Sequence, residues 1–183
     1  MIISRIDCGM GNQMFAYAAG FVTARRLGTE LLLDLEWFRK KQPRNDPRPY
    51  SLKCFPNINE RNAAFSEVYK LFPFQAVMNY LYGKNICWFL GRHLIREVLI
   101  SFMLLPEGKA RRKFLKLDPI LLPIPYSRVF TQDGSIFSEK FKMIPDDTYL
   151  WGAWQNERFF NGFHDSLRKK FRFPPEYFNN AYA

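Results

Sequence analysis

Two glycines and two amide side chains stand close together near the start of the chain, in the stretch CGMGNQMF from Cys8 to Phe15. Glycines such as Gly9 and Gly11 allow a tight backbone turn and the close approach of a ligand to the main chain. The free N–H groups of a helix that begins there favour a negative or hydroxyl-rich group. Asn12 and Gln13 can donate and accept hydrogen bonds at once. The spacing predicts a ligand-binding loop, and a plain tight turn between strand and helix is the alternative.

A dinucleotide site is a second interpretation of the same loop. The G-x-G-x-x-G fingerprint of dinucleotide-binding enzymes needs a third glycine where Met14 stands. Asp34, at the end of the next expected strand, resembles the acid that binds the ribose in that motif. A Rossmann-type dinucleotide-binding oxidoreductase therefore stays open as an alternative.

Four further side chains could act in a site. Asp7 precedes the loop and could be a general base, although an ordinary aspartate at the end of a strand explains it equally well. Cys8 could be a nucleophile, because a helix N-terminus lowers the pKa of a thiol, but with no histidine nearby a small buried cysteine is the alternative. Trp154 offers a flat apolar face and Gln155 a hydrogen-bonding partner to a ligand; packing of Trp154 in the core is the alternative. No spacing typical of metal ligands is present.

These residues lie between elements that hydrophobic periodicity predicts. Residues 2–7 and 29–35 are expected strands, the second one apolar enough for a parallel strand buried on both faces. Between them, residues 12–27 form an expected helix with one apolar face and a stop at Gly28. The rest is expected as a long loop at 42–62, a largely helical segment at 63–117, strands at 127–132 and 148–154, and a helix capped by Asn156 that runs to about Lys170.

Charge and composition describe a globular chain with an excess of cations. The 183 residues carry a net charge of +10, with basic clusters that include Arg168, Lys169 and Lys170. This balance suits an anionic partner or a solubilising surface, and a basic non-enzymatic binding module is a further alternative. No nucleic-acid-binding signature accompanies it. The apolar residues 98–105, between basic flanks, could lie on an anionic membrane surface. Three widely spaced cysteines indicate reduced thiols and a cytoplasmic protein, peripheral at most to the inner membrane face.

Three stretches, taken together and in order, resemble the bacterial alpha-1,2-fucosyltransferases of glycosyltransferase family 11. The first runs from Cys8 to Phe38, and the second is RPYSLKCF at 48–55, similar to R-x-Y-x-L-x-x-F. The third is YLWGAWQNERFF at 149–160, similar to Y-L-x-G-Y-W-Q-S-E-K-Y-F. In the first stretch the family pattern G-G-L-G-N-Q-M-F-Q-Y-A is matched at Gly9, Gly11, Asn12, Gln13, Met14, Phe15, Tyr17 and Ala18, with Cys8 in place of the first glycine.

The resemblance implies an α/β fold: the Rossmann-like N-terminal lobe of a GT-B-type glycosyltransferase, with a helical insertion. It implies an inverting enzyme that needs no metal or cofactor and moves fucose from the nucleotide sugar GDP-fucose to a galactose-containing glycan. Gly9, Gly11, Asn12, Gln13, Trp154 and Gln155 are then expected to bind substrate, with Arg48 and Tyr50 on the acceptor side.

The donor half of such an enzyme is expected elsewhere. The family's H-x-R-R-G-D motif, whose arginines hold the donor diphosphate, is not found, since neither His93 nor His164 is followed by paired arginines. Residues 1–172 are therefore expected to form the acceptor-side lobe, and 173–183 a linker toward an absent donor-binding lobe. Such a fragment is expected to be inactive alone, because transfer needs donor and acceptor held together.

Overall fold

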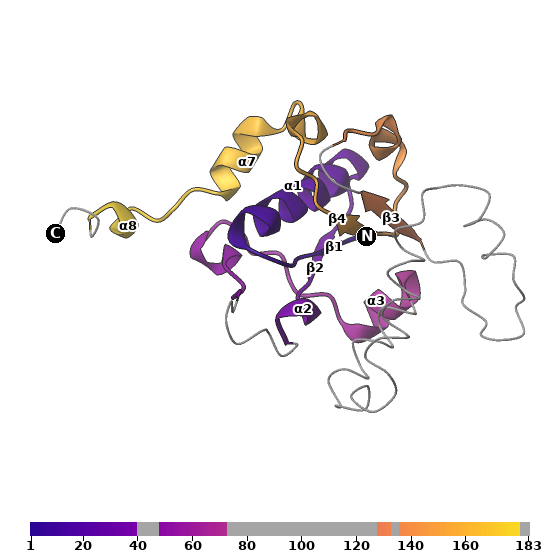
Figure 1. The fold of residues 1–183 in the computed structure, drawn as a ribbon, viewed down its shortest axis with the longest axis horizontal. Helices are drawn as coiled ribbons and strands as arrows, with labels where there is room; N and C mark the ends of the chain where they lie inside the picture. Colours follow the sequence, from indigo (N-terminus) through magenta and orange to yellow (C-terminus); the bar gives the residue numbers. More distant parts are fainter. Residues whose placement is uncertain (40–47, 73–127, 133–135, 180–183) are drawn as a thin grey trace, which may run out of the picture.

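Four parallel strands form one sheet in the order β2-β1-β4-β3 (Figure 1). The computed structural model describes residues 1–39, 48–72, 128–132 and 136–179. The strands are β1 (Ile2–Arg5), β2 (Leu31–Asp34), β3 (Val129–Gln132) and β4 (Thr148–Gly152). The helices are α1 (Met10–Leu27), α2 (Glu36–Arg39), η1 (Leu52–Cys54), α3 (Phe65–Leu71), η3 (Glu139–Met143), η4 (Glu157–Phe160), α7 (His164–Lys170) and α8 (Glu176–Asn179). The predicted α/β class is confirmed at this level.

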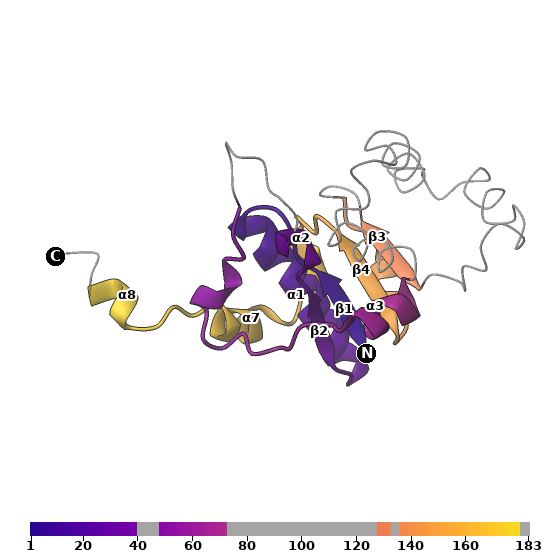
Figure 2. The same ribbon diagram turned by 90° about the horizontal axis from the view of Figure 1, so that it is seen from below.

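Alternating side chains bury both faces of the sheet. Ile2 of β1 packs in a core shared with α1, whereas its neighbour Ile3 packs against Leu71 of α3 on the other face. β2 follows the same alternation and is buried at every position. Burial of both faces explains the continuous apolar run that predicted β2. Figure 2 shows α1 and α7 on one side of the sheet and α3 on the other.

Helix α1 lies close against the sheet because a glycine faces it. A Cβ on Gly20 would lie 2.8 Å from both Ser4 Cβ and Leu31 Cδ1. Ser4 Oγ donates a hydrogen bond to the carbonyl oxygen of Ala16, at 2.7 Å. The predicted stop at Gly28 is confirmed: its φ is 64°, and its N–H bonds to the last turn of the helix.

Two predictions about helices are wrong in detail. The helix at residues 12–27 was expected to have a single apolar face. Instead, α1 is also covered by aromatic residues that follow β4, because Phe160 stacks on Phe15 and Phe171 packs against Tyr17. The helix expected from residue 156 to about 170 is two helices, η4 and α7, since Gly162 between them has a φ of 83°. Asn156 does cap the first, accepting a hydrogen bond from the N–H of Arg158 at 3.0 Å.

Several expectations fall on residues that lie outside the described ranges. Within the expected helical segment 63–117, the structure describes helix α3, and residues 73–127, including Cys87 and the apolar stretch 98–105, are not described. The expected loop at 42–62 contains the short helix η1 in its described part. In the expected linker, α8 extends away from the sheet in both views (Figures 1 and 2).

Candidate functional site

The predicted site residues gather at the carboxyl edge of the sheet. All four strands are parallel, so their carboxyl ends meet at one edge, where α/β proteins bind ligands. β1 leads into Asp7, Cys8 and the start of α1, and its neighbour β4 leads into Trp154 and Gln155. Two segments about 140 residues apart in the sequence are therefore brought together by strand pairing.

The turn between β1 and α1 owes its shape to Cys8 rather than to either glycine. Cys8 has a φ of 60°, whereas Gly9 is extended and Gly11 lies within α1. A left-handed conformation costs an ordinary residue about 1–2 kcal/mol. The prediction that the glycines supply the tight turn is therefore wrong.

The two glycines of the loop differ in their surroundings. A Cβ on Gly9 would lie 3.0 Å from Nη1 of Arg48, so the glycine allows the guanidinium of Arg48 to lie against the loop. A Cβ on Gly11 would meet nothing within 4 Å among the described residues. Gly11 is exposed at the first turn of α1, which leaves room there for another molecule to approach the backbone.

Gln13 joins the loop to the second of the three stretches. Its side chain is fully buried. Nε2 donates to the carbonyl oxygens of Cys8 and Pro49, each at 2.9 Å, and Oε1 accepts from the N–H of Ser51 at 2.8 Å. The buried amide thus makes three hydrogen bonds to backbone groups of two separate segments. Direct contact of Gln13 with a sugar stays a prediction, and in this structure Gln13 positions its neighbours.

Asn12 and Gln155 join the first stretch to the third. Nε2 of Gln155 donates a hydrogen bond to Oδ1 of Asn12 at 2.9 Å, at the molecular surface. Asn12 is half-buried and Gln155 is exposed. A surface pair of amides can rearrange to donate to and accept from the hydroxyls of a sugar.

Asp7 and Cys8 are held in ways that limit their chemistry. Asp7 Oδ2 is paired with Nε of Arg5 at 3.0 Å, and the guanidinium of Arg5 lies over the ring of Trp151, 4.2 Å from its centroid. Burial, together with the nearby carboxylate of Asp7, raises the pKa of the Cys8 thiol. A thiol with a raised pKa is a poor nucleophile at neutral pH, which argues against Cys8 as a nucleophile, although Cys8 is half-buried rather than buried.

Trp154 lies in the core rather than at the surface. Its side chain is fully buried and packs against the rings of Phe130, Phe141 and Phe159. The indole Nε1 is buried and has no hydrogen-bond partner among the described residues. This position corresponds to the core-packing alternative, and it leaves Gln155 as the residue of that pair that faces solvent.

Three other predicted residues have structural partners. Tyr50 is half-buried and its ring packs against Phe38, with the centroids 5.6 Å apart. Asp34, the candidate ribose-binding acid, is buried; it accepts a hydrogen bond from the hydroxyl of Tyr149 at 2.6 Å and another from the N–H of Glu36 at 2.9 Å. The carboxylate of Asp34 is thus engaged inside the fold. Arg48 is exposed beside Gly9.

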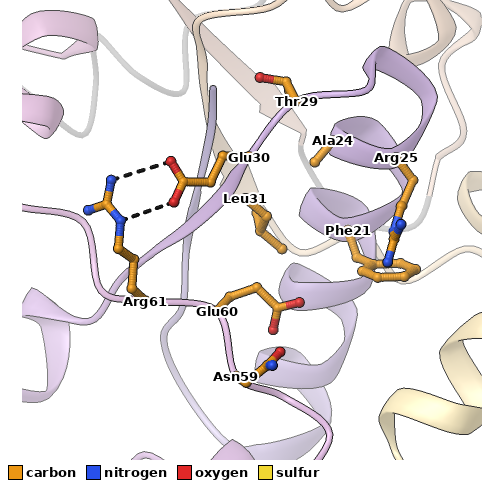
Figure 3. A pocket seen from close by; sticks show the side chains of 9 residues that line it. All are labelled: Phe21, Ala24, Arg25, Thr29, Glu30, Leu31, Asn59, Glu60 and Arg61. Carbon is orange, nitrogen blue, oxygen red and sulfur yellow. Dashed lines mark hydrogen bonds and ion pairs between the residues drawn. The ribbon is translucent and has the colours of Figure 1, made fainter.

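Two adjacent cavities, which the sequence did not predict, lie at the other end of α1. The first, of about 400 Å³, lies beside the amino end of β2 and is lined by residues that include Arg25, Glu60 and Arg61 (Figure 3). The second, of about 570 Å³, shares Phe21, Arg25 and Asn59 with the first and extends to α7. The basic cluster at Arg168–Lys170 was the one feature of the sequence that pointed to this cavity. The cavity could not be predicted from it, because Arg25, which also lines the cavity, is far away in the sequence.

Comparisons with known protein families, with curated proteins and with solved structures found no match. Within the described residues, no group of three or more His, Cys, Asp or Glu side chains is placed to hold a metal ion. Of the helices in those same ranges, none is both long enough and apolar enough to cross a membrane. The functional interpretation therefore depends on the three sequence stretches and on the geometry of the carboxyl edge.

Proposed function

We propose that the chain is the acceptor-side lobe of an inverting alpha-1,2-fucosyltransferase of the GT-B type, which moves fucose from GDP-fucose to a galactoside. One observation carries the proposal: the three stretches that resemble this family meet around the first turn of α1. Gln13 joins the first stretch to the second, and the hydrogen bond between Asn12 and Gln155 joins the first to the third. Separate segments that converge at the carboxyl edge of a parallel sheet are typical of a ligand site.

Gly11 supports the same proposal. Within a helix, glycine is less stable than alanine by about 0.5–1 kcal/mol. No described neighbour of Gly11 requires its small size, since the space around its Cα is open. We assign this unfavourable glycine to the close approach of the sugar to the backbone, with Asn12 and Gln155 beside it as hydrogen-bonding partners.

The donor is assigned to a second lobe. The diphosphate of GDP-fucose needs paired cations in fixed geometry, and neither histidine of this sequence is followed by the paired arginines of the family motif. The chain by itself then binds the acceptor without turnover, because transfer requires the two substrates to be held together.

Binding of lactose, a simple β-galactoside, tests the proposal. We expect saturable binding in saturation-transfer NMR, weakened at least tenfold in the double variant Asn12→Ala/Gln155→Ala. The control Asn62→Ala/Asn161→Ala removes two exposed amides that take no part in the hydrogen bonds between the three stretches, and it should bind as the wild type does. Circular dichroism checks that all variants are folded.

Two results would contradict the proposal. One is the absence of lactose binding by the folded wild-type chain at any concentration reached. The other is a response of the loop at residues 8–13 to NADH instead of lactose, which would favour the dinucleotide alternative.

A further inference from the structure

The larger cavity is built between the ends of two helices. α1 contributes Phe21 and Arg25, and α7 contributes Ser166, Lys169 and Lys170. The basic residues stand in the last turn of each helix. Since residues 25 and 169 are far apart in sequence, the approach of these cations is a product of the fold.

Hydrogen bonds hold the walls of this cavity in place. Nζ of Lys170 donates to the carbonyl oxygen of Asn57 and pairs with Oε1 of Glu60, both at 2.8 Å. Nδ2 of Asn57 donates to the carbonyl oxygen of Lys169 at 2.6 Å. The Lys170–Glu60 pair is largely buried, with about 16% and 15% of the side chains exposed. α7 is thus fixed to the loop before α3.

The charges that line the cavity are not balanced. Glu60 offsets Lys170, but Arg25 and Lys169 form no ion pair within the described part of the chain, where no carboxylate lines this cavity. The guanidinium of Arg25 lies 5.3 Å from the centroid of the Phe21 ring, and Nζ of Lys170 lies 5.6 Å from it. With Lys170 neutralised by Glu60, Arg25 and Lys169 leave the described lining of the cavity with a net positive charge, which favours an anion.

In the described part of the chain, no hydrogen bond joins the side chain of Arg25 to the end of α1. Cations near a helix C-terminus often serve the last carbonyl groups. In α1 two of those carbonyls are already bonded, because the N–H of Gly28 reaches Arg25 O and the N–H of Thr29 reaches Ala24 O. The side chain of Arg25 instead lies beside the ring of Phe21 (Figure 3). Its charge is therefore available to the cavity.

We propose that the larger cavity binds a phosphate group, carried by a soluble phosphoester or by a lipid headgroup. Its volume of about 570 Å³ lies in the range of small-molecule sites. Arg25 and Lys169 supply the charge, and the hydroxyl of Ser166 and the amide of Asn59 are donors for phosphate oxygens. The site lies at the opposite edge of the sheet from the proposed sugar site and does not depend on it.

Titration of the full chain with sodium phosphate at constant ionic strength tests the proposal. Amide NMR spectra should show saturable shifts around Phe21–Arg25 and Ser166–Lys170. The variant Arg25→Gln/Lys169→Gln should bind at least tenfold more weakly. The control Lys53→Gln/Arg168→Gln removes the same charge from exposed residues that do not line the cavity, and should bind within twofold of the wild type. Shifts that do not saturate, or equal weakening in the two variants, would overturn the proposal.

Vesicles distinguish the two sources of phosphate. Sedimentation with phosphatidylglycerol vesicles, against phosphatidylcholine vesicles, measures binding to an anionic headgroup. Selective loss of sedimentation in Arg25→Gln/Lys169→Gln supports the proposal with a lipid headgroup as the source. Saturable binding of free phosphate without sedimentation supports it with a soluble phosphoester. Sedimentation that falls equally in both variants, without saturable phosphate binding, would contradict it, because diffuse surface charge would then explain the attraction.

Discussion

The two edges of the sheet fix their loops by different physical means. At the carboxyl edge, neutral amides join separate segments: the buried Gln13 binds three backbone groups, and Gln155 bonds to Asn12, while the Arg5–Asp7 ion pair there joins residues of one segment. At the amino edge, charged groups precede the strands. The ammonium of Met1 pairs with Asp146 and Asp147 before β4, Arg128 before β3 also pairs with Asp147, and Glu30 before β2 pairs with Arg61.

The two kinds of interaction should differ in how strongly they depend on salt and pH. A buried amide bonded to backbone is insensitive to salt and to pH, because no group in it titrates. Exposed ion pairs contribute little and are screened by salt. We therefore expect the carboxyl edge to keep its geometry over a wide range of conditions, while the amino edge, with its cavities, changes with pH and ionic strength.

The largest expected effect is at Gln13. The substitution Gln13→Leu places an apolar side chain in a fully buried position and removes three hydrogen bonds, to the carbonyl oxygens of Cys8 and Pro49 and from the N–H of Ser51. We expect a loss of about 3 kcal/mol in the free energy of unfolding, measured with urea. Gln155→Leu, at the exposed end of the same edge, should change it by less than about 0.5 kcal/mol. Similar effects of the two substitutions would remove the distinction between a buried and a surface amide.

The next effect is at Gly20, between α1 and the sheet. A Cβ there would come within 2.8 Å of Ser4 and Leu31, so Gly20→Ala must displace the helix or the strands. Overpacking outweighs the better helix propensity of alanine, and we expect a net loss of about 1–2 kcal/mol. Thermal unfolding followed by circular dichroism measures it. An unchanged midpoint would show that α1 moves freely on the sheet.

Gly11, at the other end of the same helix, should behave in the opposite way. Its Cβ position is open, so Gly11→Ala should raise the free energy of unfolding by about 0.5–1 kcal/mol. The same substitution should weaken lactose binding, because a methyl group then stands where the sugar approaches. A more stable variant with unchanged lactose affinity would argue against close approach at Gly11.

The smallest effect is the acid sensitivity of the amino edge. Hydrogen bonds from the N-terminal ammonium lower the pKa of Asp147 below its ordinary value of 3.8. A carboxyl group with a lowered pKa stabilises the fold when charged, and this contribution is lost as the pH falls below 3.8 through the folded-state pKa. Asp147→Asn keeps a residue type that tolerates the φ of 54° at this position.

For Asp147→Asn we expect a loss of a few tenths of a kcal/mol at pH 7, and a smaller decrease between about pH 5 and pH 2 than in the wild type. Urea unfolding of the two proteins at pH 7, pH 5 and pH 2 measures these changes in the free energy of unfolding. Parallel pH profiles of the two proteins would show that this cluster of charges does not contribute.

Local patterns in the sequence were sufficient for the elements around the first loop. The apolar run that became β2, and Gly28 at the end of α1, each act through near neighbours in sequence. Gly162 was not recognised as a break between η4 and α7, because glycine is tolerated inside helices as well as between them.

The burial of the site residues depends on distant partners. Gln13 is buried by the segment at 49–51, and Trp154 by Phe130 and Phe141, none of which adjoins it in sequence. The larger cavity likewise needs α1, α7 and the loop at 56–59 together. A pattern of residue types predicts which groups can bind a ligand, but only the fold decides which of them reach the surface.

One NMR experiment with two ligands tests the central claim, that the carboxyl edge is a sugar site distinct from the charged amino edge. Amide NMR spectra of the chain would be recorded with lactose and, separately, with sodium phosphate. We expect lactose-dependent shifts at Gly9–Gln13 and Gln155, and phosphate-dependent shifts at Phe21–Arg25 and Ser166–Lys170, with little overlap. Lactose shifts confined to the amino edge, or none from a folded chain, would contradict it.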